Sequence, residues 1–312
     1  MDSAKMKSLA RDMGPLIGLI ILFIVISFLN DSFIDISNLK NLARQVSINA
    51  LIAFGMTFVI LTGGIDLSVG SILALSSALM ASMISKGMNP EMAIISSAFI
   101  GIGLGLVNGI IISYGRVAPF IATLATMTIY RGSTLVFTNG NPISGLTDDP
   151  VFTAFGQGFL LEVPVPAVVM LISFAILLFV LNKTPLGRQT YAVGGNEKVS
   201  YISGIKIDRI KIFAYALTGC LCAIAGAILT ARLNSAQPTA GMGYELDAIA
   251  AVVLGGTSLS GGKGRISGTL IGALIIGTLN NGLNILNVSS FYQQVVKGVV
   301  ILLAVLMDRK KS

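Results

Sequence analysis

Long apolar stretches recur along the whole chain, and most of them are long enough to cross a lipid bilayer as helices. The hydrocarbon core of a bilayer is about 30 Å thick, which requires roughly 17–25 apolar residues in a helix. Such stretches occupy residues 14–30, 46–62, 65–85, 92–113, 117–138, 163–182, 212–231, 245–259, 266–287 and 291–307. The eighth stretch is short, so we expect it to be tilted, broken or re-entrant. We therefore predict an all-α integral membrane protein with about ten transmembrane helices.

The amino-acid composition excludes a large soluble domain. Of the 312 residues, 54% are hydrophobic and only 11% are charged, whereas soluble domains carry about 25% charged residues. The first apolar stretch lacks a small-residue cleavage site after it, so it reads as a retained span and not as a signal peptide. We predict a single transmembrane domain over residues 1–312.

The basic residues indicate orientation. A net charge of +7 would suggest nucleic acid as a partner of a soluble protein, but the chain has no basic stripe with interleaved aromatic residues. If the N-terminus lies inside, most of the 21 Lys and Arg residues fall in inside segments, as the positive-inside rule requires. This pattern predicts that both termini face the cytoplasm, with residues 183–211 as the longest polar segment on that side.

Several kinds of chemistry are missing from the sequence. There is no His, and the two Cys residues, Cys220 and Cys222, would point to different faces of a helix and could not form a bridge. The run GTSLSGGKG resembles a nucleotide-binding loop, but Lys263 is followed by Gly264 where that motif needs Ser or Thr. We predict no catalytic residue, no metal site, no cofactor and no nucleotide site in this chain.

The run ILTGGIDLSVGSI, residues 60–72, places a carboxylate and flexible backbone between two apolar stretches. Gly63 and Gly64 should end one helix, and Asp66 should lie near the N-terminus of the next, where negative charge is favoured. A second run, GGKGRISGTLIGAL at 261–274, repeats the glycines of residues 63–75 and has Gly264 in place of the acid. This is a short internal repeat, and Asp66 is left open as a hinge residue or a substrate contact.

Two further patterns carry structural predictions. Gly101, Gly105 and Gly109 repeat every four residues, which predicts close packing between helices. Within 183–211 we expect a short helix at about 195–203 with Asn196 as its N-cap, Glu197 in its first turn and Gly204 as its stop. That helix suits either docking of a soluble partner or a solvated connector.

The chain resembles the permease subunits of bacterial carbohydrate ABC importers from roughly residue 45 to its C-terminus. The resemblance is carried by GMTFVILTGGIDLSVGS, LGRQTYAVGGNEKVSYISGIKIDRIK and the long run SAQPTAGMGYELDAIAAVVLGGTSLSGGKGRISGTLIGALIIGTLNNGLNIL. It implies a multi-pass protein of the bacterial cytoplasmic membrane that imports ribose or a related monosaccharide. It also implies three protein partners: a cytoplasmic ATP-binding subunit, an extracytoplasmic sugar-binding protein and a second copy of the chain.

The resemblance also assigns residues. The family's coupling loop, which meets the ATP-binding subunit, corresponds to Gly194, Gly195, Asn196, Glu197 and Gly204 within 183–211. A neutral sugar needs a hydrated path with hydrogen-bonding groups through the membrane. The candidates to line this path are the polar residues within spans: Asp66, Asn108, Thr123, Thr126, Asn280, Asn281 and Asn284. Such residues face the bundle interior or a cavity, or they bond one helix to another.

Two basic residues lie within predicted spans, and one alternative function stays open. Arg131 should reach toward the outer surface, and Lys297 should either do the same or pair within the bundle. The alternative function is an ion-coupled secondary sugar carrier, which needs ionisable residues in the middle of the membrane. Asp66 is the only acid that supports it in this sequence.

Overall fold

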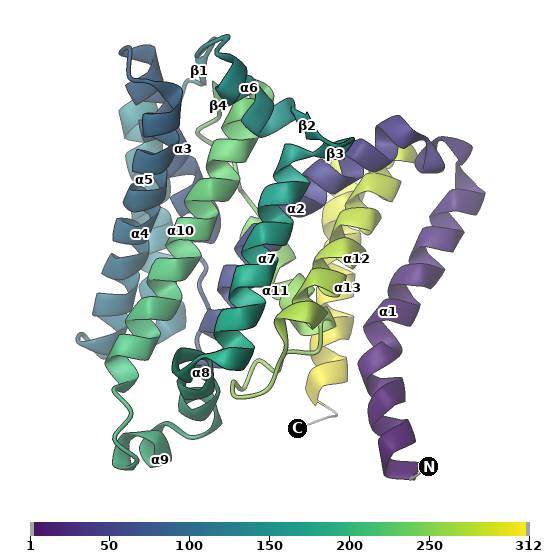
Figure 1. The fold of residues 1–312 in the computed structure, drawn as a ribbon, viewed down its shortest axis with the longest axis vertical. Coiled ribbons are helices and arrows are strands. Elements are labelled where there is room, and N and C mark those ends of the chain that lie inside the picture. Colours follow the sequence, from purple (N-terminus) through teal and green to yellow (C-terminus); the bar gives the residue numbers. More distant parts are fainter. Residues whose placement is uncertain (1–2, 310–312) are drawn as a thin grey trace.

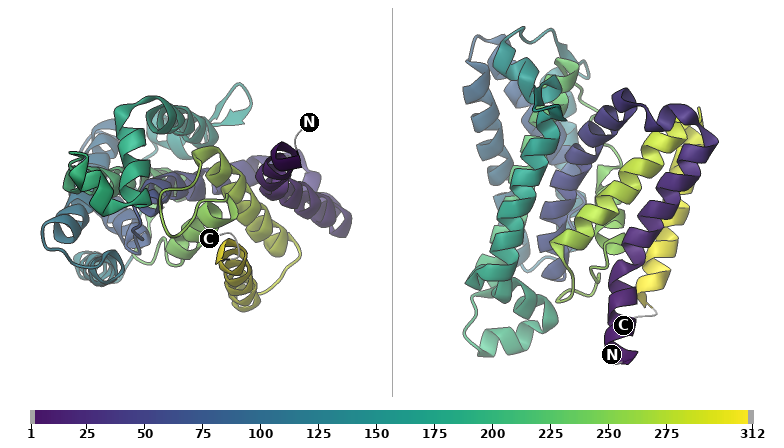
Figure 2. Two further views of the ribbon diagram at one scale, coloured as in Figure 1. Left: turned by 90° about the horizontal axis from the view of Figure 1, so that it is seen from below. Right: turned by 45° about the vertical axis from the view of Figure 1, so that its right-hand side comes forward.

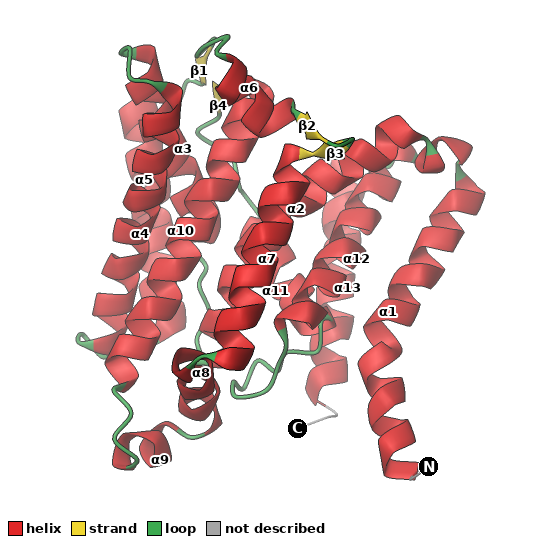
Figure 3. Ribbon diagram, in the orientation of Figure 1, coloured by secondary structure: helices red, strands yellow, loops and turns green. Residues whose placement is uncertain are grey.

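The computed structural model describes residues 3–309, so both ends of the predicted domain 1–312 lie outside the described residues. The described chain is mainly helical (Figures 1 and 3). Its helices are α1 (Ser3–Leu29), α2 (Ile36–Leu61), α3 (Val69–Ser85), α4 (Pro90–Ser113), α5 (Pro119–Thr138), α6 (Pro150–Gln157), α7 (Val165–Lys183), α8 (Pro185–Gly195), α9 (Glu197–Ile202), α10 (Ile207–Leu233), α11 (Tyr244–Leu254), α12 (Ile266–Ile285) and α13 (Ser290–Arg309), with a short 3₁₀ helix, η1 (Asp31–Ile34). Two antiparallel pairs join β1 (Ile143–Ser144) to β4 (Ser235–Ala236), and β2 (Phe159–Leu160) to β3 (Val163–Pro164).

Within residues 3–309, six helices are long and apolar enough to cross a membrane, namely α2, α4, α5, α7, α10 and α12. Shorter apolar helices occupy Gly14–Leu29, Val69–Ser85 and Ser290–Leu303. The stretch predicted at 245–259 forms only α11, whose 11 residues span about 16 Å at 1.5 Å per residue. Helix α11 is therefore too short to cross the bilayer by itself, because the chain turns at Gly255 and at Gly256, whose φ is +86°.

Helix α2 lies at the centre of the bundle. Its C-terminal half, including Phe54, Phe58 and Leu61, is fully buried because this stretch is apolar on every side and is covered by α7, α10, α11 and α12. Helix α10 packs on one side of α2 and carries α3 and α4, with α5 packed on α3, while α12 packs on the other side of α2 with α1 and α13 beyond it (Figure 2). Most outward side chains of α7, and of α1 from Gly14 onward, are apolar and exposed, as for helices that face lipid.

The predicted glycine stripe makes a close contact between two helices. A Cβ at Gly101 would collide with the carbonyl oxygen of Gly219, and one at Gly105 with that of Tyr215. The missing side chains bring the backbones of α4 and α10 together, which confirms the predicted packing role.

The two ends of the bundle differ. One end carries α6 and all four short strands, and the other carries α8 and α9 (Figure 1). Both ends of the described chain lie at the α8–α9 end (Figure 1). At the α6 end, Lys40 donates a 2.6 Å hydrogen bond to Glu162, and this bond lowers the pKa of the Glu162 carboxyl. Lys40 also lies 4.7 Å from the centre of the Phe159 ring, so it holds the β2–β3 hairpin against α2.

Candidate functional site

A non-helical link, residues 62–68, joins α2 to α3. Gly63 adopts φ +81°, a conformation that suits Gly, and it ends α2 as predicted. Gly64 is needed for a different reason, because a Cβ there would lie 2.5 Å from the hydroxyl oxygen of Tyr215. The link therefore lies tightly against α10.

Asp66 lies two residues before the N-cap of α3 and is fully buried. Its Oδ1 accepts hydrogen bonds from the backbone N–H of Ser68 at 2.9 Å and from the Ser68 hydroxyl at 2.6 Å. Asn108 on α4 in turn donates to the Ser68 hydroxyl oxygen at 2.8 Å. Asp66 thus fixes the start of α3, and Ser68 ties that start to α4.

Two acceptors of this network stay unbonded within the described residues, the Oδ2 of Asp66 and the Oδ1 of Asn108. Thr123 on α5 lies beside the same link and donates to the carbonyl oxygens of Pro119 at 2.9 Å and Ile65 at 3.2 Å. Thr126 donates at 3.3 Å to Thr123. The structure brings four predicted path residues together here, and all four are buried within the chain and face no open surface of it.

The three remaining path candidates lie on α12. Asn281 is buried and exchanges hydrogen bonds of 3.0 and 3.1 Å with Asn38 on α2. Asn284 accepts a 2.9 Å bond from Gln293 on α13. Both contacts join one helix to another, which was the alternative role predicted for these residues.

Asn280 belongs to a charged cluster that the sequence did not single out. Asp247 on α11 is only 3% exposed, and its Oδ2 accepts from Lys297 at 2.9 Å and from Asn280 at 3.3 Å. Lys297 therefore pairs inside the bundle, one of the two outcomes expected for it. The acid lies 50 residues from its lysine in the chain, and the only available signal was an acidic residue inside an apolar stretch.

The expectation for Arg131 was wrong. Its Nη1 donates to the carbonyl oxygens of Pro238 at 2.7 Å and Ala240 at 2.8 Å. These carbonyls belong to the non-helical stretch between β4 and α11, so Arg131 turns toward the protein instead of the outer surface.

The predicted short helix is present as α9. The Asn196 side chain accepts a 3.0 Å bond from the N–H of Val199, which caps the helix. Glu197 follows in the first turn and pairs with Lys211 at 2.9 Å. Gly204 adopts φ +81° just past the helix end, as predicted for its stop signal.

Helix α8 touches the end of α2 and the 261–262 turn. A Cβ at Gly194 would collide with the carbonyl oxygen of Leu61 and lie 2.5 Å from the nitrogen of Gly262. That Gly262 nitrogen donates to the Leu61 carbonyl at 3.0 Å, and Gly261 lies against Gly63. We call this contact of Leu61, Gly63, Gly194, Gly261 and Gly262 the glycine junction.

A cavity of about 440 Å³ opens beside the glycine junction. Its lining includes the 62–64 link, the α8–α9 corner at Gly194–Glu197, and Lys211 and Tyr215 of α10. The corner that is predicted to meet an ATP-binding subunit therefore shares a cavity with the link that carries Asp66. Among the described residues, no group of three or more His, Cys, Asp or Glu side chains could hold a metal ion.

Comparisons with known proteins agree with this architecture. Residues 38–305 match a family model described as branched-chain amino acid transport system / permease component. The chain is 67% identical over 302 residues to the ribose import permease protein RbsC of Bacillus subtilis (strain 168), covering 97% of this chain and 94% of that protein. Identity to the ribose import permease protein RbsC of Escherichia coli (strain K12) is 54% over 308 residues, covering 98% and 96% of the two chains.

A more distant relative is the D-allose transport system permease protein AlsC of Escherichia coli (strain K12), 43% identical over 278 residues, or 89% of this chain and 85% of that protein. A solved metal-chelate type ABC transporter in an inward-facing conformation aligns with TM-score 0.53, covering 95% of this chain and 98% of its own. Because the two sequences are only 14% identical, this likeness establishes the fold alone.

Proposed function

This chain belongs to the branched-chain amino acid transport system / permease component family, and on that premise we propose that it is the permease subunit of a bacterial ATP-driven ribose importer. The observation that carries the proposal is its near full-length identity to ribose import permeases, at 67% and 54%. The relative whose name concerns allose is only 43% identical. Ribose is therefore the cargo that the comparisons favour.

The proposed architecture is a multi-pass inner-membrane protein with ten membrane segments and both termini in the cytoplasm. It treats α11, together with the non-helical stretch 237–243 before it, as one broken span and not as a single membrane-spanning helix. The support is that both ends of the described chain lie at the same end of the bundle as α8 and α9 (Figure 1), together with the bias of basic residues toward that side. Residues 183–211 form the cytoplasmic coupling loop of a single transmembrane domain.

The proposed assembly holds two copies of this chain, a cytoplasmic ATP-binding subunit and an extracytoplasmic sugar-binding protein, all within membrane lipid. The chain has no nucleotide site of its own in this proposal, so ATP hydrolysis occurs in the partner. Gly194, Gly195, Asn196, Glu197 and Gly204 make the contact, because their corner is exposed on one side and packed against the glycine junction on the other.

The mechanism follows from those contacts. Movement of the α8–α9 corner displaces Gly194, which touches both the end of α2 and the 261–262 turn. Because the 62–68 link continues into α3, such a movement reaches the Asp66 network. Asp66 acts in this scheme as a hinge residue. Its burial against Ser68 and Asn108 makes it a poor site for a coupling ion, which disfavours the secondary-carrier alternative.

Uptake in a bacterial strain that lacks its own ribose transport tests the proposal. The chain is expressed with its cognate ATP-binding and sugar-binding subunits, and uptake of radiolabelled ribose, allose and arabinose is measured. We expect ribose to be taken up fastest. Faster uptake of allose or arabinose would make the cargo wrong but leave the permease role intact, and no uptake of any sugar would contradict the role itself.

A further inference from the structure

The stretch between β4 and α11, residues 237–243, enters the bundle without forming a helix (Figure 1). Gly241 adopts φ +73° and its backbone touches Gly70 in the first turn of α3. Arg131 on α5 holds the stretch by its carbonyl groups at Pro238 and Ala240. The beginnings of two short helices, α3 and α11, therefore meet beside Arg131.

Helix lengths place this meeting point inside the hydrocarbon layer. Gly70 lies 15 residues before the end of α3 at Ser85, or about 22 Å at 1.5 Å per residue. Arg131 lies 12 residues after Pro119 and 7 before Thr138, or about 18 and 10 Å from the two ends of α5. Since the layer is about 30 Å thick, neither group reaches a membrane surface.

The stretch is nevertheless not sealed by the chain. Thr239 is exposed, Met242 is 68% exposed and Leu246 is 49% exposed, while Arg131 and Glu245 are partly exposed. Non-helical backbone and ionisable side chains are tolerated at this depth only where they face protein or a water-filled cavity. A lipid-facing surface is thus excluded for this face, which must border water or another protein surface.

Arg131 and Glu245 can each form hydrogen bonds beyond those that they make within the chain. Arg131 uses only Nη1 in its bonds to Pro238 and Ala240 within the described residues, which leaves the N–H groups of Nε and Nη2. The Glu245 carboxylate faces the backbone N–H groups of Gly243 and of Glu245 itself at the start of α11. A carboxylate has about four acceptor sites, so Glu245 retains some for a ligand.

We infer that Arg131 and Glu245 form a contact site for the hydroxyl groups of the sugar in the middle of the membrane, at the meeting point of α3 and α11. The inference rests on the proposed function. Arg131 donates to hydroxyl oxygens, Glu245 accepts from hydroxyl groups, and Met242 and Leu246 supply an apolar edge for the carbon face of the ring. This differs from the seven polar residues that the sequence suggested, five of which are buried inside the chain.

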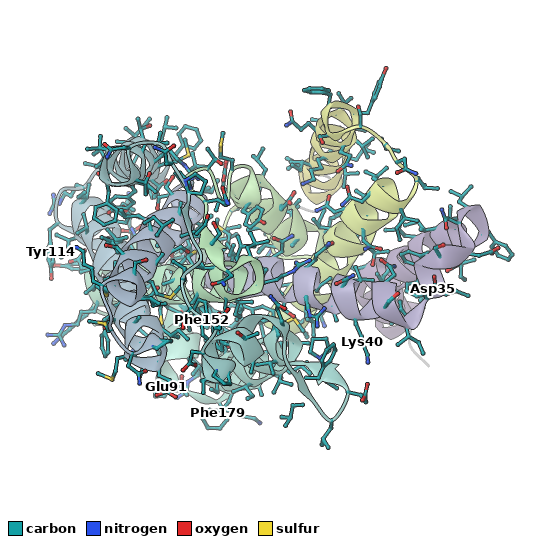
Figure 4. All side chains as sticks on the ribbon, turned by 90° about the horizontal axis from the view of Figure 1, so that it is seen from above. Asp35, Lys40, Glu91, Tyr114, Phe152 and Phe179 are labelled. Carbon is teal, nitrogen blue, oxygen red and sulfur yellow. The ribbon has the colours of Figure 1, made fainter. Side chains whose placement is uncertain are left out.

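Thiol labelling tests whether the face is wet. In a background with Cys220→Ala and Cys222→Ala, Met242→Cys is compared with Phe179→Cys, a 62% exposed residue at the periphery of the bundle (Figure 4). A charged, water-soluble thiol reagent is applied to the assembled transporter in membranes opened to both sides. We expect Met242→Cys to react at least about tenfold faster, because the reactive thiolate forms only in contact with water, and its labelling should block ribose uptake.

Equal and slow labelling at both positions would overturn the inference. Leu246→Cys replaces Met242→Cys if the latter fails to assemble. Labelling shows only that the face meets water, so two further variants, Glu245→Gln and Arg131→Lys, test whether the two side chains contact the sugar. Each should lower the maximal rate of ribose uptake about tenfold, the scale of a lost hydrogen bond to a charged group, without changing the concentration for half-maximal uptake, which the sugar-binding protein sets.

A structural role would instead lower the amount of assembled complex or its basal ATPase activity, so both are measured beside uptake. Unchanged maximal rates in both variants would contradict sugar contact. Ribose uptake by the wild-type complex is measured in parallel, so failure of this inference stays distinct from failure of the proposed function.

Discussion

Gly194→Ala places one methyl group in the glycine junction and should uncouple the α8–α9 corner from α2. The added Cβ would collide with the carbonyl oxygen of Leu61 and lie 2.5 Å from the nitrogen of Gly262 and 2.9 Å from the carbonyl carbon of Leu61. These are backbone atoms, so no side-chain rotation relieves the collision. Either α8 moves away or the 3.0 Å bond from Gly262 to Leu61 breaks.

The magnitude follows from three contributions. Overpacking costs about 1–3 kcal/mol, and a lost hydrogen bond costs about 0.5–1.5 kcal/mol. Ala is better than Gly within a helix by about 1 kcal/mol, which offsets part of this. The free energy of unfolding should therefore fall by about 0.5–3.5 kcal/mol, which still allows the protein to fold, and the change is confined to the contact between α8 and α2.

The neighbouring residue supplies a matched control. A Cβ at Gly195 meets nothing within 4 Å, so Gly195→Ala should leave stability within about 1 kcal/mol of the wild type. The assay is ATP hydrolysis and ribose uptake by the reconstituted complex. We expect Gly194→Ala to hydrolyse ATP with little uptake and Gly195→Ala to do both. Equal uptake by the two variants would refute the role of the glycine junction.

Four other predictions concern particular contacts. Gly105→Ala should lower the free energy of unfolding in detergent by about 1–3 kcal/mol, whereas Gly103→Ala, which meets nothing within 4 Å, should not; equal melting temperatures would contradict the packing role. Lys297→Met leaves Asp247 buried without a cation and should cost about 3–5 kcal/mol, and adding Asp247→Asn should recover most of that loss in a thermal melt. Gly204→Pro, which cannot adopt φ +81°, and Glu197→Lys should abolish sugar uptake without affecting membrane insertion; unchanged sugar-stimulated ATPase activity would count against the docking role. Asp66→Asn still offers an oxygen to Ser68 and should assemble normally, whereas Asp66→Leu should give less assembled complex; equal yields would refute the hinge role.

Local features were predictable from the sequence because their causes lie within a few residues. Asn196 caps α9 through its own side chain, and Gly204 ends that helix through its own φ. The break after α2 likewise follows from Gly63. The stripe from Gly101 to Gly109 was predictable because a four-residue period places small residues on one face of a helix.

Contacts between distant segments were not predictable in the same way. Arg131 binds carbonyls 107 and 109 residues away, and a single sequence shows no link between them. The glycine junction brings together residues near 61, 194 and 262 through backbone contacts that leave no side-chain pattern. The short α11 was suspected from its length, but its position beside Gly70 depends on how the stretch after β4 enters the bundle.

Sugar movement by the purified components tests the central claim most directly. Proteoliposomes are prepared with this chain and its ATP-binding subunit, with ribose and the sugar-binding protein on the side opposite ATP. We predict that ribose accumulates on the ATP side only when ATP and both partners are present. Accumulation driven by a proton or sodium gradient, without ATP or the ATP-binding subunit, would contradict the account.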